Sequence, residues 1–277
     1  MIEQLFGAVG ALELRCEPGP EPGGTTLQAA FAAEYPPYLE DRVESWLHAL
    51  ARRGPVRLES AWGEGPWQPG WRAIFRGGPL GRRFWVRPPW PGGLPVPAAR
   101  TPIVLDPRGA FGSGQHPTTQ TVVAALEALA EPAAGQPALD VGTGSGVLAV
   151  VLAHLGYAPS ALDLEPLARA ACRRTAAANG VRVQVLEQGV EQLRQRFALV
   201  AANLDPQAVV TLAAELVRVL APGGTLVLGG LRPAGIEQLL RESYASLHHR
   251  RTVLSAGGDW AALVLAAPSR SAAGASD

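Results

Sequence analysis

Strand-like and helix-like segments alternate from about residue 102 to 267, and this pattern most constrains the fold. Apolar runs typical of strands, such as "PIVLD", "PALDV", "SALDL" and "FALVAANL", alternate with helical runs such as "GVLAVVLAHLG" and "AVVTLAAELVRVLAPGG". Strands joined through helices form a mostly parallel sheet with helices on both faces. The last segment, "RRTVLSAGGDWAALVLAA", predicts two strands around a Gly-Gly turn. We therefore predict an α/β fold whose final hairpin adds an antiparallel strand.

Three other blocks complete the predicted organisation. Residues 1–62 read as a small α+β unit, with a strand near "LELRCE", a helix over "YLEDRVESWLHALAR" and a strand at "VRLESAW". We expect the first strand of such a unit to be missing. Residues 63–101 are rich in Trp, Pro, Gly and Arg, which predicts a connector packed between two domains, the alternative being a disordered linker. The polar and small residues at positions 268–277 predict a disordered tail.

A glycine-rich loop, "LDVGTGSGVL", follows one predicted strand and opens a helix. Its glycines, Gly142, Gly144 and Gly146, suggest a backbone that a ligand or another segment approaches closely. A dinucleotide-binding fingerprint would need a small residue where Val147 stands. Asp140 precedes the first glycine, and its carboxylate suits a ligand with a positive end, such as the ammonium of an amino acid. The alternative is a tight turn in which the aspartate is an N-cap.

Polar residues end the next strands of the predicted sheet. Asp163 ends "SALD", 21 residues after Gly142, where a carboxylate can accept both hydroxyls of a ribose. A ribose and an amino-acid tail together describe S-adenosylmethionine. Asn203 ends the strand "FALVAAN", and its side-chain carbonyl with the Leu204 backbone carbonyl could orient an amine toward a methyl group. The alternative for Asn203 is a turn residue before Asp-Pro.

The segment "DPRGAFGSGQHPTTQT", residues 106–121, precedes the glycine loop. Its glycines, including Gly112, and the apolar Phe111 suggest a loop that folds over the ligand. Thr118 or Thr119 could be the N-cap of the following helix. His116 could be a base or a metal ligand, but without a second ligand in register we interpret it as a structural histidine.

The composition excludes several functions. The 24 basic residues, all arginine, balance 24 acidic ones, so we expect no direct nucleic-acid partner and no membrane surface. A mechanism that uses a lysine of the chain itself is also excluded. Cys16 and Cys172 lack metal-site or disulfide spacing. The sequence shows neither a signal peptide nor an apolar run of about 18 residues, so we expect a cytoplasmic protein.

These motifs together resemble the PrmA family, the methyltransferases of ribosomal protein L11. "LDPRGAFGSGQHPTT", "LDVGTGSGVLA", "ALDLEP", "AANG" and "VAANL" follow in the family's order, and "WQPGWRAIFRGGPLGRRFWVRPPW" is similar to its Trp-rich connector. The resemblance implies a Rossmann-like, seven-stranded class I methyltransferase sheet with a small amino-terminal, truncated ferredoxin-like α+β domain that recognises the substrate protein.

The resemblance also implies roles for individual residues. Asn203 and Leu204 would act on the reacting amine. S-adenosylmethionine would be bound by Phe111, Gly112, Thr119, Asp140, Gly142, Gly144, Gly146, Asp163 and Asn203, without a metal. We expect a monomer whose partner is ribosomal protein L11, free or on the ribosome.

Two departures from the family pattern are visible. Asp205-Pro206 follows Asn-Leu where the family has small or apolar residues, and Pro66 replaces an acidic residue. Both lie outside the predicted cofactor site and bear on the choice of protein target. Three alternatives therefore remain: a methyltransferase of the same fold for another protein or a small amine, a cofactor-binding ribosome partner without catalysis, and a nicotinamide oxidoreductase.

Overall fold

The computed structural model describes residues 13–18, 25–30, 75–106, 112–129 and 134–269, in two compact units divided after Phe75. In the first unit, β1 (Glu13–Pro18) pairs antiparallel with β2 (Thr25–Ala30). β1 confirms the strand predicted near "LELRCE", whereas β2 was not predicted. The helix predicted at 38–52 and the strand predicted at 56–62 lie outside the described residues.

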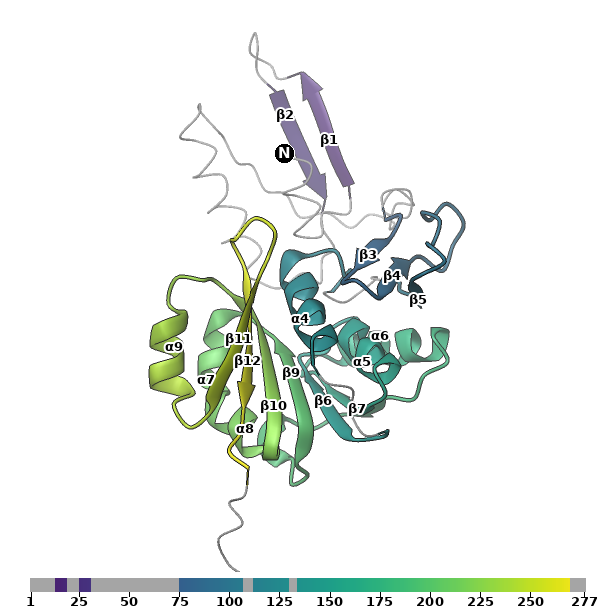
Figure 1. Cartoon of the computed structure of the whole chain (residues 1–277). Coiled ribbons are helices and arrows are strands. Elements are labelled where there is room, and N and C mark those ends of the chain that lie inside the picture. The colour runs from purple at the N-terminus through teal and green to yellow at the C-terminus, as the bar shows by residue number, and fades with distance from the viewer. Residues whose placement is uncertain (1–12, 19–24, 31–74, 107–111, 130–133, 270–277) are drawn as a thin grey trace, which may run out of the picture. The chain divides into compact units, whose positions relative to one another are not determined.

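The second unit is built on a large mixed sheet, which Figure 1 shows from its face. Within residues 134–269, seven strands lie in the order β11-β12-β10-β9-β6-β7-β8. They are β6 (Pro137–Val141), β7 (Ala158–Leu162), β8 (Gln184–Leu186), β9 (Phe197–Asn203), β10 (Leu220–Leu231), β11 (His248–Leu254) and β12 (Ala261–Ala266). Strands β6 to β10 are parallel, and β12 runs antiparallel between β10 and β11. The predicted α/β sheet and closing hairpin are confirmed.

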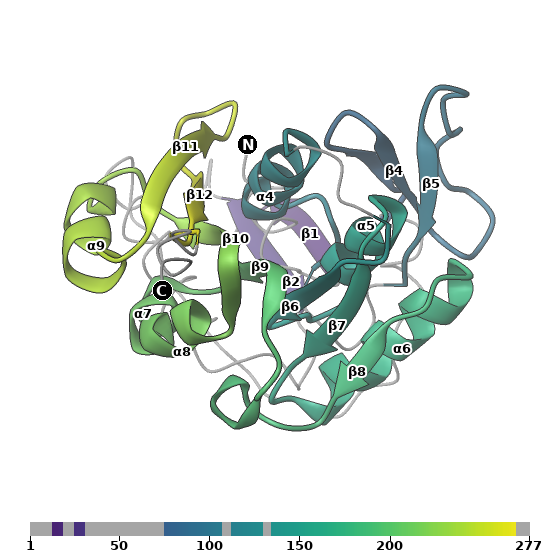
Figure 2. The same cartoon turned by 60° about the horizontal axis from the view of Figure 1, so that its bottom comes forward.

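Helices lie on both faces of this sheet, with α4, α5 and α6 on one side and α7, α8 and α9 on the other (Figure 2). They are α4 (Pro117–Glu127), α5 (Val147–His154), α6 (Pro166–Ala178), α7 (Pro206–Thr211), α8 (Ala213–Arg218) and α9 (Ile236–Ser243); a short 3-10 helix, η1, spans Val190–Gln192. No helix in the described part of the chain is long and apolar enough to cross a membrane.

The single helix predicted over residues 208–224 is wrong. The chain forms two short helices that meet at Leu212, and β10 already begins at Leu220. Pro222 and the two glycines after it cannot continue a helix favourably. The chain pairs with β9 there instead, although the register shifts between Leu220 and Thr225.

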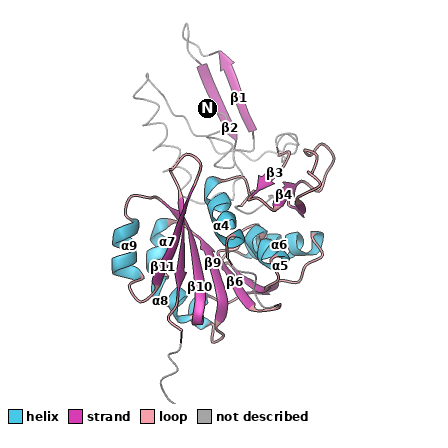
Figure 3. Ribbon diagram, in the orientation of Figure 1, coloured by secondary structure: helices cyan, strands magenta, loops and turns pink. Residues whose placement is uncertain are grey.

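A separate three-stranded sheet precedes α4, as Figure 3 shows in magenta. It contains β3 (Gly78–Leu80), β4 (Phe84–Arg87) and β5 (Thr101–Val104), with β4 antiparallel to β3 and parallel to β5. The strand predicted at "PIVLD" therefore belongs to this small sheet, and the parallel order of the large sheet starts with β6. The division into four segments at residues 62, 101 and 267 stays a prediction.

The core forms on both faces of the large sheet, because alternate strand residues point to opposite sides. Val200 and Ala202 of β9 are fully buried in the cluster that includes Val209 and Leu216 of α7 and α8. On the other face, Ala161 packs with Ala149 of α5 and Cys172 of α6. This packing fixes the ends of β6, β7 and β9, from which the polar loops emerge.

Candidate active site

The carboxyl ends of β6, β7, β9 and β10 meet at one edge of the large sheet. Val141 at the end of β6 is paired with Leu162 of β7 and Ala202 of β9, and Asn203 is paired with Gly229 of β10. Ligands of open α/β sheets bind outside this edge. The glycine loop, Asp163 and Asn203 all follow these strand ends, so the structure brings together the elements that the sequence predicted.

The three glycines of the loop all adopt positive φ, at +71° for Gly142, +52° for Gly144 and +85° for Gly146. Side chains other than glycine are strained in this conformation. At Gly146 a Cβ would also lie 2.7 Å from the Cα of Cys172 in α6. At Gly142 a Cβ would collide with the Leu204 side chain. The loop is therefore shaped by its protein neighbours at two of its three glycines.

Asp140 lies inside this loop rather than on its surface. Its side chain is fully buried, and its Oδ2 accepts hydrogen bonds from Thr143 Oγ1 at 2.6 Å and the Ala149 backbone N–H at 3.0 Å. Oδ1 has no hydrogen-bond partner among the described residues. Burial raises the pKa of Asp140 from 3.8 to about 7, against the lowering effect of these two hydrogen bonds. Asp140 thus orders the loop, and its contact with a ligand ammonium stays a prediction.

Asp163 is the first residue after β7 and is partly exposed. Its Oδ2 accepts a hydrogen bond from the Gly144 backbone N–H at 2.9 Å, and its Oδ1 accepts one from Glu165 at 3.0 Å. The Arg169 guanidinium of α6 donates to the backbone carbonyls of Asp163 and Leu164, both at 2.8 Å. The carboxylate is thus held beside the glycine loop, at the strand tip where a ribose hydroxyl pair is predicted to bind.

Asn203 ends β9 beside the start of α4. Its Nδ2 donates long hydrogen bonds to the hydroxyls of Thr118, at 3.3 Å, and Thr119, at 3.4 Å. Because the amide nitrogen faces the two threonines, Oδ1 is the group left to accept a hydrogen bond. Thr119 is almost fully buried, and its direct contact with the cofactor stays a prediction.

Two glycines of β10 lie against the end of β9, Gly229 beside the Asn203 side chain and Gly230 beside the Leu204 backbone. A Cβ at Gly229 would lie 2.7 Å from Asn203 Oδ1, and one at Gly230 would overlap the Leu204 carbonyl oxygen. Both glycines lie in the apolar run "TLVLGGL" of β10. Adjacent glycines within an apolar strand are a signal of close backbone approach.

His116 is the N-cap of α4, so the N-cap predicted at Thr118 or Thr119 is wrong. Its Nδ1 accepts from the Thr118 backbone N–H at 3.2 Å and lies 2.8 Å from Thr118 Oγ1. Pro117 then occupies the first helical position, where its missing N–H costs least. The interpretation of His116 as structural agrees with this geometry. Across the described ranges, no group of three or more His, Cys, Asp or Glu residues could hold a metal ion.

The His116 ring also contacts a stack of side chains that the sequence analysis did not assign to the site. His116 lies edge-on to Trp260, with ring centroids 5.3 Å apart. The Arg232 guanidinium lies over the same Trp260 ring, 3.8 Å from its centroid. Trp260 precedes β12 and Arg232 follows β10, so the stack adds a cationic and aromatic wall at the same sheet edge.

Gly112 lies against the glycine loop. Its carbonyl accepts a hydrogen bond from Ser145 Oγ at 2.6 Å, and its φ of +110° would strain any other residue. Phe111, the predicted neighbour of the ligand, lies outside the described residues. The segment that contains Gly112 thus reaches the predicted cofactor loop.

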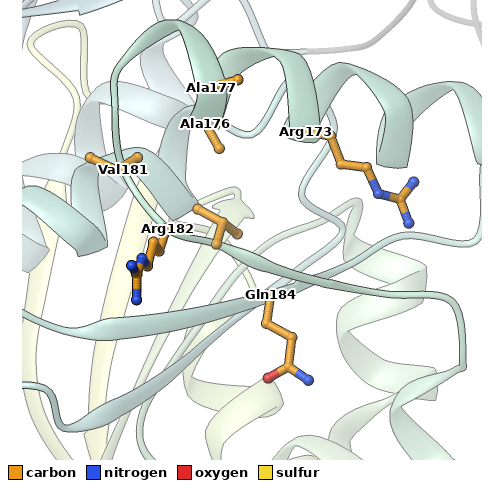
Figure 4. Close-up of a pocket in the computed structure, with 7 residues that line it drawn as sticks. Arg173, Ala176, Ala177, Val181, Arg182 and Gln184 are labelled. Carbon is orange, nitrogen blue, oxygen red and sulfur yellow. The ribbon is translucent and has the colours of Figure 1, made fainter.

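A groove elsewhere on the molecule has no link to this edge. It lies between the C-terminal half of α6 and the start of β8, and Arg173, Arg182 and Gln184 line it (Figure 4). Arg173 pairs with Glu187 at 2.7 Å. The groove lies at the start of β8, whereas the candidate site lies beyond the carboxyl ends of the strands, so the groove is not part of the candidate site.

The sheet order, the antiparallel β12, the glycine loop after β6 and the acid after β7 define the Rossmann-like class I methyltransferase fold. A solved structure agrees: the ribosomal protein L11 methylase from Lactobacillus delbrueckii subsp. bulgaricus superposes with a TM-score of 0.62 at 28% identity. The match covers 70% of this chain and 99% of that one.

Sequence comparison identifies the family. The model of ribosomal protein L11 methyltransferase (PrmA) matches residues 42–268, and the chain belongs to this family. Two relatives named ribosomal protein L11 methyltransferase come from Geobacter metallireducens, 39% identical over 61% of this chain, and Geobacter sulfurreducens, 35% identical over 72%. The matched part spans 55% and 65% of these relatives' own length.

Proposed function

We propose that this protein transfers a methyl group from S-adenosylmethionine to amino groups of ribosomal protein L11. One observation carries the proposal: Asn203 and Leu204, which offer the two acceptors, stand at the end of β9, next to the strand β6 that leads into the glycine loop. Asn203 is held by α4, and the Leu204 side chain packs against Gly142. The printed names of the relatives supply ribosomal protein L11 as the substrate.

The residues at the sheet edge fit the methyl donor. Asp163 has the position and the charge to accept the ribose hydroxyls, and the positive-φ glycines remove side chains from the loop beside it. S-adenosylmethionine supplies a methyl group on a sulfonium that is already a good leaving group. The protein therefore contributes mainly the positions of the reactants.

Asn203 and Leu204 orient the amine that receives the methyl group. Asn203 Oδ1 and the Leu204 carbonyl accept two N–H groups of the amine, so that its lone pair faces the methyl carbon. The amine has to be neutral to attack, and burial disfavours the charged ammonium. Entry into the dehydrated site therefore helps the lysine lose its proton to solvent, and no dedicated base is needed.

We also propose that the protein acts in the cytoplasm, in keeping with a ribosomal substrate, as a monomer without direct contact to nucleic acid. The balanced charge supports the last point, since phosphate binding relies on an excess of basic groups.

The test is mass spectrometry of ribosomal protein L11 after incubation with the full chain and isotope-labelled S-adenosylmethionine. We expect labelled lysine or amino-terminal groups, and an Asn203→Ala control should transfer far less label. Label in another protein of a lysate, with none in ribosomal protein L11, would reassign the substrate. Failure of calorimetry to detect S-adenosylmethionine binding would overturn the methyltransferase proposal as a whole.

A further inference from the structure

Helix α4 connects the small sheet to the candidate site. Near its N-terminus, Thr118 and Thr119 contact Asn203. Later in the helix, the side chains of Gln120 and Glu127 contact the turn between β3 and β4. The helix thus contacts both Asn203, at the end of β9, and the small sheet.

The Gln120 side chain joins three segments through its amide. Its Oε1 accepts a hydrogen bond from the Gly81 backbone N–H at 3.0 Å. Its Nε2 donates to the carbonyls of Pro79, at 2.8 Å, and Gly114, at 2.7 Å. Both amide hydrogens and the amide oxygen are therefore used, and one of the three bonds holds the segment that precedes α4.

Glu127 holds the same turn without touching that segment. Its carboxylate accepts hydrogen bonds from the backbone N–H groups of Arg82, at 2.8 and 3.0 Å, and Arg83, at 2.7 Å. Successive N–H groups of a turn form a concave anion site. Glu127 thus anchors the turn to α4, whereas Gln120 also anchors Gly114.

The segment from Gly112 to His116 lies between the small sheet and the glycine loop. Gly114 is buried, and a Cβ there would lie 2.8 Å from Val86 of β4 and 3.8 Å from Val147 at the start of α5. Two residues earlier, the Gly112 carbonyl accepts the hydrogen bond from Ser145. A displacement of Gly114 would therefore reach the loop between Gly144 and Gly146.

We infer that Gln120 is a positioning residue for cofactor binding, which holds the segment 112–116 against the glycine loop through its bond to the Gly114 carbonyl. The inference rests on the proposed function, in which S-adenosylmethionine occupies that loop. None of these hydrogen bonds of Gln120 involves Asp163 or Asn203. Its loss changes the affinity for the cofactor, while the transfer step at saturation is preserved.

The test compares Gln120→Met with a matched control, Glu127→Gln. Methionine keeps the length of the side chain but removes all three hydrogen bonds. The control weakens the attachment of the β3–β4 turn and leaves the Gly114 bond intact. Calorimetry gives the Kd for S-adenosylmethionine without acceptor, steady-state assays with ribosomal protein L11 give kcat and KM, and thermal unfolding gives the stability of each variant.

We expect Gln120→Met to raise the Kd and the KM for S-adenosylmethionine about tenfold, equivalent to roughly 1.4 kcal/mol. Its kcat should stay within about twofold of the wild type, as expected when only binding is lost. Glu127→Gln should lower the midpoint of thermal unfolding with little change in Kd. If Gln120→Met does not fold, Gln120→Glu replaces it, because a carboxylate cannot donate to Gly114.

Three results would overturn the inference. An unchanged Kd in a folded Gln120 variant would show that the Gly114 bond does not position the cofactor loop. An equal rise in Kd in Glu127→Gln would assign the effect to the turn. A fall in kcat with normal Kd would place Gln120 in the transfer step. Absence of S-adenosylmethionine binding by the wild type, by contrast, would refute the proposed function itself.

Discussion

Gly146→Ala tests why the glycine loop needs glycine at its third position. Gly146 has a φ of +85°, and an alanine Cβ would lie 2.7 Å from Cys172 Cα and 3.0 Å from its Sγ. The left-handed conformation costs a non-glycine residue roughly 1–2 kcal/mol. The crowding against α6 adds about 1–3 kcal/mol, the usual range for overpacking. We therefore expect a loss of roughly 2–5 kcal/mol in the free energy of unfolding.

A matched control separates the two contributions. Gly180 also has a left-handed backbone, with a φ of +63°, but an added Cβ would meet no heavy atom within 4 Å. Gly180→Ala should therefore lose only the conformational part, and the change in denatured-state entropy is common to both variants. Urea unfolding of the two variants gives their difference, which we expect to be about 1–3 kcal/mol.

The refuting result is equal destabilisation of the two variants. It would mean that α6 can move away from Gly146 without cost, and that the third glycine is not required by helix packing. If the packing argument holds, Gly146→Ala should also weaken S-adenosylmethionine binding, because Gly146 is the N-cap of α5 and joins the loop to this helix.

Three further substitutions test the site. Asn203→Ala should lower single-turnover methyl transfer at saturating cofactor by about a hundredfold, the order of loss for a positioning contact; a change in Kd alone would assign Asn203 to the cofactor pocket. Asp163→Ala should weaken calorimetric binding of S-adenosylmethionine by roughly 1.5–3 kcal/mol, and unchanged affinity would remove Asp163 from the site. Burial raises the pKa of Asp140 from 3.8 to about 7. Its contribution to the free energy of unfolding is therefore fully present below the unfolded pKa near 3.8, and it is lost as the pH rises through the folded pKa near 7. Asp140→Asn should flatten the pH dependence of unfolding in that window, and an unaltered slope would contradict the buried, protonated carboxyl.

The edge of the large sheet could be predicted from local sequence because its elements are long and regular. A parallel sheet places the carboxyl ends of its strands at one edge, so Asp163 and Asn203 had to lie near the glycine loop. β5 could not be placed in the same way. Its partner β4 is chosen by contacts remote in sequence, such as the Arg100 guanidinium on the carbonyls of Gly81 and Phe84.

The interior of the site was harder to predict than its outline. A carboxylate before a glycine loop reads equally well as a ligand for a cation and as an internal cap, and only the fold shows Asp140 bonded to Thr143 and Ala149. His116 occupies the N-cap position of α4, for which the sequence predicted a threonine. Its imidazole nitrogen can accept the same backbone hydrogen bond, which propensity scales for capping do not emphasise.

The contacts around α4 and α6 indicate how the small sheet serves the site. At the end of β5, Asn179 of the α6 C-cap accepts from the Val104 N–H at 2.8 Å and donates to its carbonyl at 2.7 Å. At the other end of the connection to α4, Gly112 is bonded to Ser145, and Gly114 is bonded to Gln120. Both ends of the segment between β5 and α4 are thus fixed by side chains of the methyltransferase core. Residues 112–116, held by these bonds, lose less conformational entropy when a ligand binds, so the affinity for that ligand depends on anchors far from the reacting atoms. For this reason the Gln120 substitution is expected to change binding rather than chemistry.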